Sequence, residues 1–488
     1  LRIAQILADG DGKALYLVPL KALGGEKYRD YEEFFPDHDV ALSVGDRDSS
    51  ADYIEAKDLI IMTVEKLDAV LRHGPTWVKD VETVVVDEIH LLDAEGRGPT
   101  LEVTLTRLRE LMEFQLLGLS ATVSNSGEMA DWLDADLVES GYRPVDLQEG
   151  IYSQGSITFY DADTHHERSS GTNSEEFVTG TEKLAEERSV PAGDEVEIAT
   201  PYGRPELNLL HDTLERGHQA ITFVRSRKSA ESTAEKAGKA AGDHLSRTEQ
   251  DELAALADRV EHVLGSPTEQ CRRLARCVKN GAAFHHAGLL SQQRELIEDA
   301  FRDGLLKNVA ATPTLAAGVS LPAYRIIVRD LKRYTDSGLE YIPTLEYKQM
   351  AGRAGRPEHH DRGEAVAVAK SPGDVDEVRD RYVLGEVEEI YSKLAVEPVL
   401  RMHALGLIAT RFVSDFDGLD AFFQRTFYAH QYGESEEVRG KLEDVVRTLE
   451  EYGFVEAGAD GLAPTTIGKR VAELYIDPYT AHHLLQHL

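Results

Sequence analysis

Residues 81–90, VETVVVDEIH, contain a continuous apolar run that ends in two adjacent carboxylates. The valines at 84–86 follow one another without polar alternation, which is typical of a strand buried on both faces in a parallel sheet covered by helices. Ligands of such open sheets bind where the strands end at their carboxyl side. We therefore expect Asp87 and Glu88 to lie at the ligand-binding edge of an α/β domain, although an ordinary strand ending in solvated acids has the same pattern.

Similar short apolar runs, bounded by turn residues and separated by amphipathic stretches, recur along the chain. A first series lies at 14–20, 39–44, 58–64 and 114–122, and a second at 219–226, 281–289, 307–315, 324–331 and 363–370. Buried strands that alternate with helices predict a parallel sheet. The sequence therefore predicts an α/β fold with two such domains in tandem.

Domain boundaries are expected where this pattern changes. Residues 161–200 are acidic and poor in large apolar side chains, which predicts an exposed insertion within a first domain at 1–205. A second domain would follow at 206–388. Three helices and two short apolar segments around a Gly/Asp turn then predict a winged-helix domain at 389–466, and we interpret 467–488 as the start of a further helical domain. The three helices are expected at 386–412, 418–432 and 435–456.

The composition indicates a folded protein of several domains. Of 488 residues, 42% are hydrophobic, which is enough apolar side chain for a core in each domain. No apolar run is long enough to cross a membrane, and the chain does not open with a basic region followed by an apolar one, so we expect a soluble, cytoplasmic protein. Cys271 and Cys277 have neither a disulfide framework nor a usual metal-ligand spacing, and we expect two reduced thiols on a helix.

The formal net charge of −34 is spread through periodic apolar segments, so it indicates the solvated surface of folded domains. Such a surface suits molar salt, where the Debye length falls to about 3 Å and self-repulsion is screened. We hypothesise a haloarchaeal source. The melting temperature is expected to rise between dilute buffer and multimolar KCl, and a melting temperature that does not rise with salt would contradict the hypothesis.

Three more segments carry residues that suit phosphate chemistry. Residues 118–122, GLSAT, end a strand with hydroxyl groups that could bond His90 or the carboxylates. Residues 349–357, QMAGRAGRP, place two arginines at a helical spacing, so both guanidinium groups are expected on one face, where they suit phosphate oxygens. Residues 311–319, ATPTLAAGV, end a strand with small residues that let a ligand approach the backbone. Each segment alone is equally explained by a turn cap, a solvated basic turn or small-residue packing.

Taken in this order, the segments resemble the motifs of superfamily 2 DExH helicases. The resemblance covers residues 16–23 (motif Ia), 63–66 (motif Ib), 87–90 (motif II), 120–122 (motif III), 223–227 (motif IV), 284–289, 311–323 (motif V) and 349–357 (motif VI). It implies two RecA-like domains that bind ATP and Mg²⁺ between them.

The resemblance also implies residue roles. Asp87 would hold Mg²⁺ through a water and Glu88 would be the general base. Gln349, Arg353 and Arg356 would reach ATP from the second domain, and Gly318 would also contact the nucleotide. Coupling of hydrolysis to movement is expected from His90, Ser120 and Thr122, and contacts with the nucleic-acid backbone from Pro19, Lys21, Thr63, Ser226, Arg227, His286, Thr312 and Thr314.

The resemblance narrows to one group within this superfamily. The segments responsible are motifs V and VI, the helical region after them and YIDPYTA at 475–481. They look like the archaeal DNA helicases thought to act at stalled replication forks, which are relatives of the helicase part of polymerase theta. In that family two RecA-like domains are followed by a winged helix and a helical ratchet domain, and a monomer moves 3′ to 5′ on single-stranded DNA. The expected partners are single-stranded and forked DNA and replication or repair proteins, and residues 325–343 would hold the strand-separating hairpin.

The chain departs from this family in the nucleotide-binding loop. Lys13 and Lys239 each follow a glycine, but neither has the preceding glycine loop or the following Ser/Thr of a Walker A motif. We expect that motif upstream of Leu1 and the rest of the ratchet domain beyond Leu488, so the chain by itself is predicted to be inactive. Two alternatives remain, an RNA helicase of the neighbouring DExH branch and a nucleic-acid-binding scaffold without ATPase activity.

Overall fold

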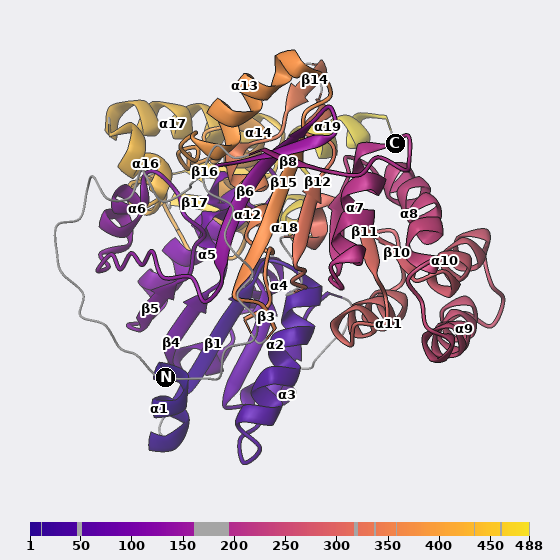
Figure 1. Ribbon diagram of the computed structural model, residues 1–488. Helices are drawn as coiled ribbons and strands as arrows, with labels where there is room; N and C mark the ends of the chain where they lie inside the picture. Colours follow the sequence, from indigo (N-terminus) through magenta and orange to yellow (C-terminus); the bar gives the residue numbers. More distant parts are fainter. Residues whose placement is uncertain are drawn as a thin grey trace, which may run out of the picture. The chain divides into compact units, whose positions relative to one another are not determined.

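The computed structural model describes residues 1–10, 12–45, 51–160, 195–316, 321–335, 338–357, 359–433, 435–458 and 461–487 (Figure 1). Gly318 and residues 161–194 of the predicted acidic insertion lie outside these ranges. The chain divides into two compact units, one formed by Leu1–Val138 with Glu389–Leu488 and the other by Glu139–Glu388.

The first unit contains a parallel sheet of five strands in the order β2-β3-β1-β4-β5. The strands are β1 (Lys13–Val18), β2 (Val40–Ser43), β3 (Leu59–Thr63), β4 (Val81–Val86) and β5 (Gln115–Gly118). The helices α1 (Arg2–Asp9), α2 (Lys21–Phe34), α3 (Ala51–Glu55), α4 (Val64–Leu71), α5 (Gly98–Leu111) and α6 (Ser126–Leu133) accompany them. All five strands coincide with predicted apolar runs. Strands β1 to β4 are mostly buried, as expected for a covered parallel sheet, whereas β5 at the sheet edge is largely exposed. The α/β prediction is therefore confirmed for this unit.

The second unit contains a sheet of eight strands in the order β10-β11-β9-β12-β15-β6-β7-β8. The strands that match the predicted runs are β9 (Ala220–Phe223), β10 (Ala282–His285), β11 (Asn308–Ala311), β12 (Arg325–Val328) and β15 (Arg362–Val368), and all are parallel. The helices are α7 (Pro205–Glu215), α8 (Arg227–Gly242), α9 (Arg247–Glu261), α10 (Glu269–Lys279), α11 (Ser291–Arg302), α12 (Thr344–Ala351) and α13 (Val375–Val378). Cys271 and Cys277 are free and buried on α10, as expected.

The predicted boundary at residue 205 is wrong. Strands β6 (Asp146–Ser153), β7 (Ser156–Tyr160) and β8 (Glu195–Glu197) belong to the second sheet, because β6 pairs in parallel with β15 and the other two continue from it in antiparallel fashion. Ile157 and Phe159 pack in the same core as Leu210 of α7 and Val366 of β15. A strand pattern predicts an extended segment but not the sheet with which it pairs, so composition alone placed the boundary too late.

The C-terminal region of the first unit is helical with one small hairpin, and its assignment as a winged-helix domain stays a prediction. Its elements are α14 (Glu397–Ala409), α15 (Phe416–Phe423), α16 (Phe427–Tyr432), α17 (Ser435–Glu451), β16 (Val455–Gly458), β17 (Gly461–Pro464), α18 (Thr466–Glu473) and α19 (Pro478–Gln486). Val471 on α18 and Ala481 on α19 share one core with Leu400 on α14. The described part of 467–488 therefore packs with the preceding helices rather than around a core of its own.

All three predicted C-terminal helices differ in extent from the observed ones, and the third ends at Glu451 rather than at residue 456. Helix α14 begins only at Glu397, where Pro398 suits the first turn, and the segment before it is not helical. Ile390 and Leu394 in that segment are buried, which explains its apolar pattern. The helix expected at 418–432 is split into α15 and α16, because the Thr426 hydroxyl accepts a hydrogen bond from the Ala429 backbone and starts a new helix.

Glu102 on helix α5 forms hydrogen bonds to the C-terminal region of the same unit. It is fully buried and accepts hydrogen bonds from the Ser392 hydroxyl at 2.6 Å and from the Tyr428 backbone N–H at 2.7 Å. Burial nevertheless raises the pKa of its carboxyl from 4.5 to about 7. The folded protein thus binds a proton more tightly than the unfolded chain does, and the free energy of unfolding falls as pH rises from about 4.5 through 7.

Replacing Glu102 with glutamine should remove this pH dependence, because the amide stays neutral and keeps an oxygen for the Tyr428 N–H. The mutant should gain about 3 kcal/mol over the wild type between pH 4.5 and pH 8. Urea unfolding at both pH values measures the change. Glu113→Gln, at an exposed position just after the same helix, is the control, and a difference that stays constant with pH would contradict the assignment to Glu102.

None of the helices in the described residues combines the length and the apolar character needed to cross a bilayer.

Candidate active site

Asp87 and Glu88 stand at the carboxyl end of β4, as predicted, and both are partly exposed. The Asp87 backbone N–H donates to the Leu17 carbonyl of β1 at 2.9 Å, which continues the sheet by one residue. Glu88 then takes a left-handed conformation with φ of 55°. This conformation is energetically unfavourable for a residue with a Cβ atom, and such strain occurs at sites where a side chain must be held in one particular direction. The turn ends the strand and presents both carboxylates at its end.

Tyr16, in the neighbouring strand β1, holds Asp87. Its hydroxyl donates to Asp87 Oδ2 at 2.9 Å, and burial together with the Asp87 charge raises the pKa of the phenol well above its usual range. Burial and Asp87 also raise the pKa of Tyr31, whose ring lies 5.7 Å from that of Tyr16, to about 12. Both phenols therefore stay protonated, and one Asp87 oxygen is fixed while the other is left for a ligand. The sequence analysis missed Tyr16 as a site residue because only the strand order makes β1 and β4 neighbours.

His90 connects Glu88 to the end of β5. The ring is buried, and burial lowers its pKa to about 4, so it is neutral at physiological pH. Its Nδ1 lies 3.3 Å from Glu88 Oε2 and 3.4 Å from the Ala121 backbone N–H. A neutral ring can donate from Nδ1 to the carboxylate or accept there from the amide, but not both. The predicted link to 120–122 therefore runs through the Ala121 backbone, and Ser120 and Thr122 are exposed beside it.

Pro19 and Lys21 follow β1 and Thr63 is the last residue of β3, so they share the sheet edge with Asp87. Lys21 is exposed at the first position of α2. Thr63 is buried, and its hydroxyl caps α4 by accepting from the Lys66 backbone N–H at 3.4 Å. The structure thus gives Thr63 a structural task, and its contact with nucleic acid stays a prediction. A partly exposed guanidinium that the sequence analysis did not single out, that of Arg97, donates to the Pro19 carbonyl at this edge and pairs with Glu65.

Lys13 lies at the opposite edge of the same sheet. It opens β1, beside Val81 at the start of β4, and its ammonium donates to the carbonyls of Glu55 and Lys57 at 2.8 Å each. Lys239 lies in the last turn of helix α8. Lys13 is therefore not placed to hold a phosphate beside the carboxylates of the same sheet.

The second sheet gathers the other predicted nucleic-acid contacts at the carboxyl ends of β9, β10 and β11. Ser226 caps α8 by accepting from the Ser229 backbone N–H at 3.2 Å, and Arg227 after it is exposed. Thr312 is buried and shares a hydrogen bond of 2.9 Å with the hydroxyl of the exposed Thr314. These side chains meet because the three strands are parallel neighbours.

His286 is the exception in this group. Its side chain is 1% exposed, its Nδ1 accepts from the Gly288 backbone N–H at 3.1 Å, and its Nε2 lies 3.5 Å from Glu231 Oε1. Burial lowers its pKa. The ring supports the loop before α11 rather than facing solvent, so the predicted direct contact is not supported.

The two arginines at 349–357 do not lie on one helix face, and that prediction is wrong. Helix α12 carries Gln349 and ends at Ala351, and Gly355 turns the chain with φ of 89°. Arg353 donates to the Ala316 carbonyl. Arg356 donates to the carbonyls of Pro322, Arg302 and Phe301 at 3.1, 3.1 and 2.9 Å, and burial lowers its pKa. Helical spacing in a sequence does not show where a helix ends.

The predicted strand-separating hairpin is shorter than residues 325–343. It consists of β13 (Lys332–Thr335) and β14 (Gly338–Tyr341), which pair in antiparallel fashion. Tyr334 is exposed on it, with the Arg225 guanidinium 5.5 Å from the ring centre. Arg325 does not belong to the hairpin, because it is fully buried within β12.

Comparison with known proteins finds helicases that are similar to this chain over nearly its whole length. The chain is 42% identical to the ATP-dependent DNA helicase Hel308 of Methanocella arvoryzae over 492 residues, covering 99% of this chain and 61% of that protein. It is 39% identical to the Hel308 helicase of Pyrococcus horikoshii, with 98% and 61% covered, and 36% identical to that of Methanococcus vannielii, with 98% and 64% covered. The chain thus spans less than two thirds of the length of these relatives.

Two family models also match. Residues 1–130, which contain the first sheet, match the DEAD/DEAH box helicase family, and residues 205–358, which contain β9 to β12, match the helicase conserved C-terminal domain. Together the two matches cover more than half of the chain. With its two parallel-sheet α/β units, the chain belongs to the superfamily 2 helicases of the DEAD/DEAH box type.

Proposed function

We propose that the complete protein is an ATP-dependent DNA helicase that moves 3′ to 5′ along single-stranded DNA and acts in the repair or restart of stalled replication forks. The observation that carries the proposal is the carboxylate pair at the end of β4, with Asp87 held by Tyr16 and Glu88 beside the neutral His90. The relatives named above are ATP-dependent DNA helicases, and they match this chain over nearly its whole length, which supports DNA as the substrate.

The residues present suit magnesium and ATP. Carboxylate oxygens are the protein ligands that Mg²⁺ prefers, and Asp87 has one oxygen fixed by Tyr16 and one left for the ion or its water. When bound, Mg²⁺ neutralises charge on the phosphates. Glu88 would accept the proton of the attacking water. His90 would orient the Glu88 carboxylate, and because its Nδ1 also lies near the Ala121 backbone N–H, it would transmit a change in the state of Glu88 to Ala121.

The second unit would supply positive charge to the phosphates from Arg353 and Arg356 and a neutral amide donor from Gln349. Arg356 would have to give up hydrogen bonds to three carbonyls, so a change in the segment around Pro322 must accompany its use. Arg227, Thr314, Lys21 and the exposed Tyr334 are proposed to contact single-stranded DNA through its backbone and bases. Backbone contacts and ring stacking suit translocation because they carry little sequence preference.

The test is ATP hydrolysis by the full-length protein in multimolar KCl, as the proposed haloarchaeal origin requires, with single-stranded DNA, single-stranded RNA or neither. Stimulation by DNA, followed by unwinding of duplexes with a 3′ tail but not a 5′ tail, is the expected result. Stimulation by RNA alone would assign the protein to the RNA branch. No hydrolysis under any condition would leave a nucleic-acid-binding scaffold and contradict the proposal.

A further inference from the structure

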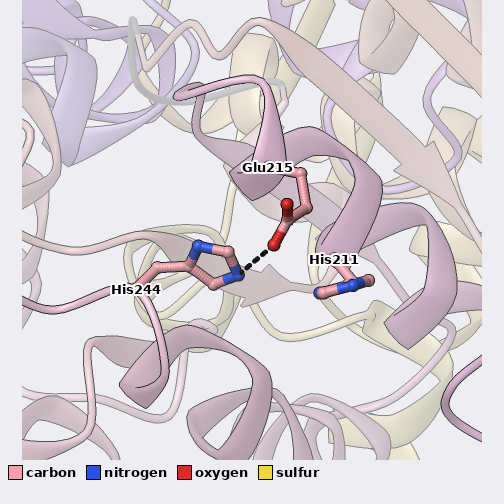
Figure 2. A group of neighbouring side chains, drawn as sticks. All are labelled: His211, Glu215 and His244. Atoms are coloured by element: carbon pink, nitrogen blue, oxygen red, sulfur yellow. Dashed lines mark ion pairs between the residues drawn. The ribbon is translucent and has the colours of Figure 1, made fainter.

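Three potential metal ligands come together in the second unit, away from the residues discussed above. His211 and Glu215 lie one turn apart on α7, and His244 follows the end of α8 at Gly242. Residues four apart on a helix share one face, so the two α7 side chains project together. Figure 2 shows His211 and Glu215 on α7 and His244, from the segment after α8, facing Glu215.

The distances suit a single ion. His244 Nε2 lies 3.6 Å from Glu215 Oε1, and one ligand atom from each residue lies within 4.8 Å of the others. A tetrahedral ion with bonds of about 2.1 Å separates its ligand atoms by about 3.4 Å. Small side-chain rotations therefore bring all three atoms to bonding distance without moving either helix.

An ion pair between His244 and Glu215 does not account for the whole cluster. His211 Nδ1 is buried and has no hydrogen-bond partner among the described residues. Its ring is instead placed by ring contacts, 5.8 Å from Tyr202 and 5.7 Å from His244. A buried polar nitrogen without a hydrogen-bond partner lowers the stability of the fold. The His211 ring also lies beside His244, the imidazole that Glu215 faces, so two imidazoles and one carboxylate come together. The Glu215 side chain is 62% exposed, which leaves a path for an ion from solvent.

We propose that His211, Glu215 and His244 bind one Zn²⁺ ion. Two imidazoles and a carboxylate are a typical zinc ligand set, and imidazole selects zinc over the Mg²⁺ that the carboxylates of β4 suit. A fourth position remains for water. The ion joins the end of α7 to the end of α8, and α8 begins at Arg227, so zinc fixes the helix that presents this residue at the sheet edge.

The experiment is a titration of the full chain, stripped of metal by a chelator, with ZnCl₂ in competition with a chromophoric zinc chelator. We expect one equivalent to bind and the melting temperature to rise with zinc. Co²⁺ should give the visible absorption of a four-coordinate ion with nitrogen and oxygen ligands. His211→Ala, His244→Ala and Glu215→Gln should each weaken zinc binding by at least about tenfold.

The control is His262→Ala. His262 Nδ1 lies 3.2 Å from Asp258 Oδ1 in an exposed pair, and no third metal-ligating side chain joins it among the described residues, so its loss should leave zinc binding unchanged. Glu215→Gln keeps the size of an exposed side chain and guards against loss of folding, which circular dichroism checks. Absence of stoichiometric zinc binding would overturn the proposal. So would binding that His211→Ala leaves intact, because it would leave only the His244–Glu215 ion pair.

Discussion

Glu88→Gln is expected to abolish ATP turnover by the full-length protein while leaving its affinity for single-stranded DNA unchanged. The amide has the size of the carboxylate and can still meet His90, but it cannot accept the proton of an attacking water. General-base catalysis contributes about 10²- to 10⁴-fold, and the loss of turnover should lie in that range. Hydrolysis of ATP at saturating DNA and binding of a labelled single strand measure the two effects separately.

A matched substitution lies on the same strand. Glu82→Gln, at an exposed position near the start of β4, changes the same charge at the opposite end of the strand and should leave turnover unchanged. Unaltered turnover in Glu88→Gln would exclude Glu88 as the base. A loss of DNA binding in proportion to the loss of turnover would instead show that Glu88 shapes the fold of the sheet edge.

Arg325→Met is expected to give the largest loss of stability in the second unit. The Arg325 side chain is fully buried, and it donates to Glu364, to Asp212 at 2.8 Å, and to the Leu209 carbonyl and the Thr213 hydroxyl at 3.0 Å. Glu364 is equally buried. Removing the guanidinium leaves that carboxylate poorly compensated, which costs about 3–5 kcal/mol. Urea unfolding monitored by circular dichroism measures the loss.

Two further variants show whether the effect comes from the buried charge. Arg333→Met removes a partly exposed arginine of the hairpin that pairs with Glu346, and such surface pairs are worth about 0.2–1 kcal/mol. Arg325→Met combined with Glu364→Gln should recover much of the stability, because the amide carries no charge. An Arg325→Met loss no larger than that of Arg333→Met would contradict a central role for this pair.

The strands that the sequence predicted well are short runs dominated by apolar residues. Leu59 to Met62, for example, are all buried in β3, and only a covered parallel sheet accommodates such a run. The pairing of β6 with β15 could not be predicted in the same way. It depends on contacts between residues about two hundred positions apart, such as Gly363 with Leu147, which no local pattern records.

Some residues of the candidate site were predicted from the sequence and others were not. Asp87 and Glu88 were placed correctly because the end of a strand is visible in the sequence. Tyr16 was missed because its contact depends on strand order, and His286 was misjudged because burial depends on packing. Arg353 and Arg356 keep the spacing of a helix that ends just before them. Side chains set by local turns were predictable, whereas those set by tertiary neighbours were not.

The division of the chain affects the order in which it folds during synthesis. Residues 139–388 separate the two segments of the first unit, so the ribosome makes the whole second unit before the first can close. At about 5–20 residues per second that interval lasts roughly 12–50 s. During this time Glu102 lacks Ser392 and Tyr428, which follow it by 290 and 326 residues. During synthesis, helix α5 of the first sheet therefore stays uncovered until the C-terminal region has been made. This is the stage at which a chaperone would be needed.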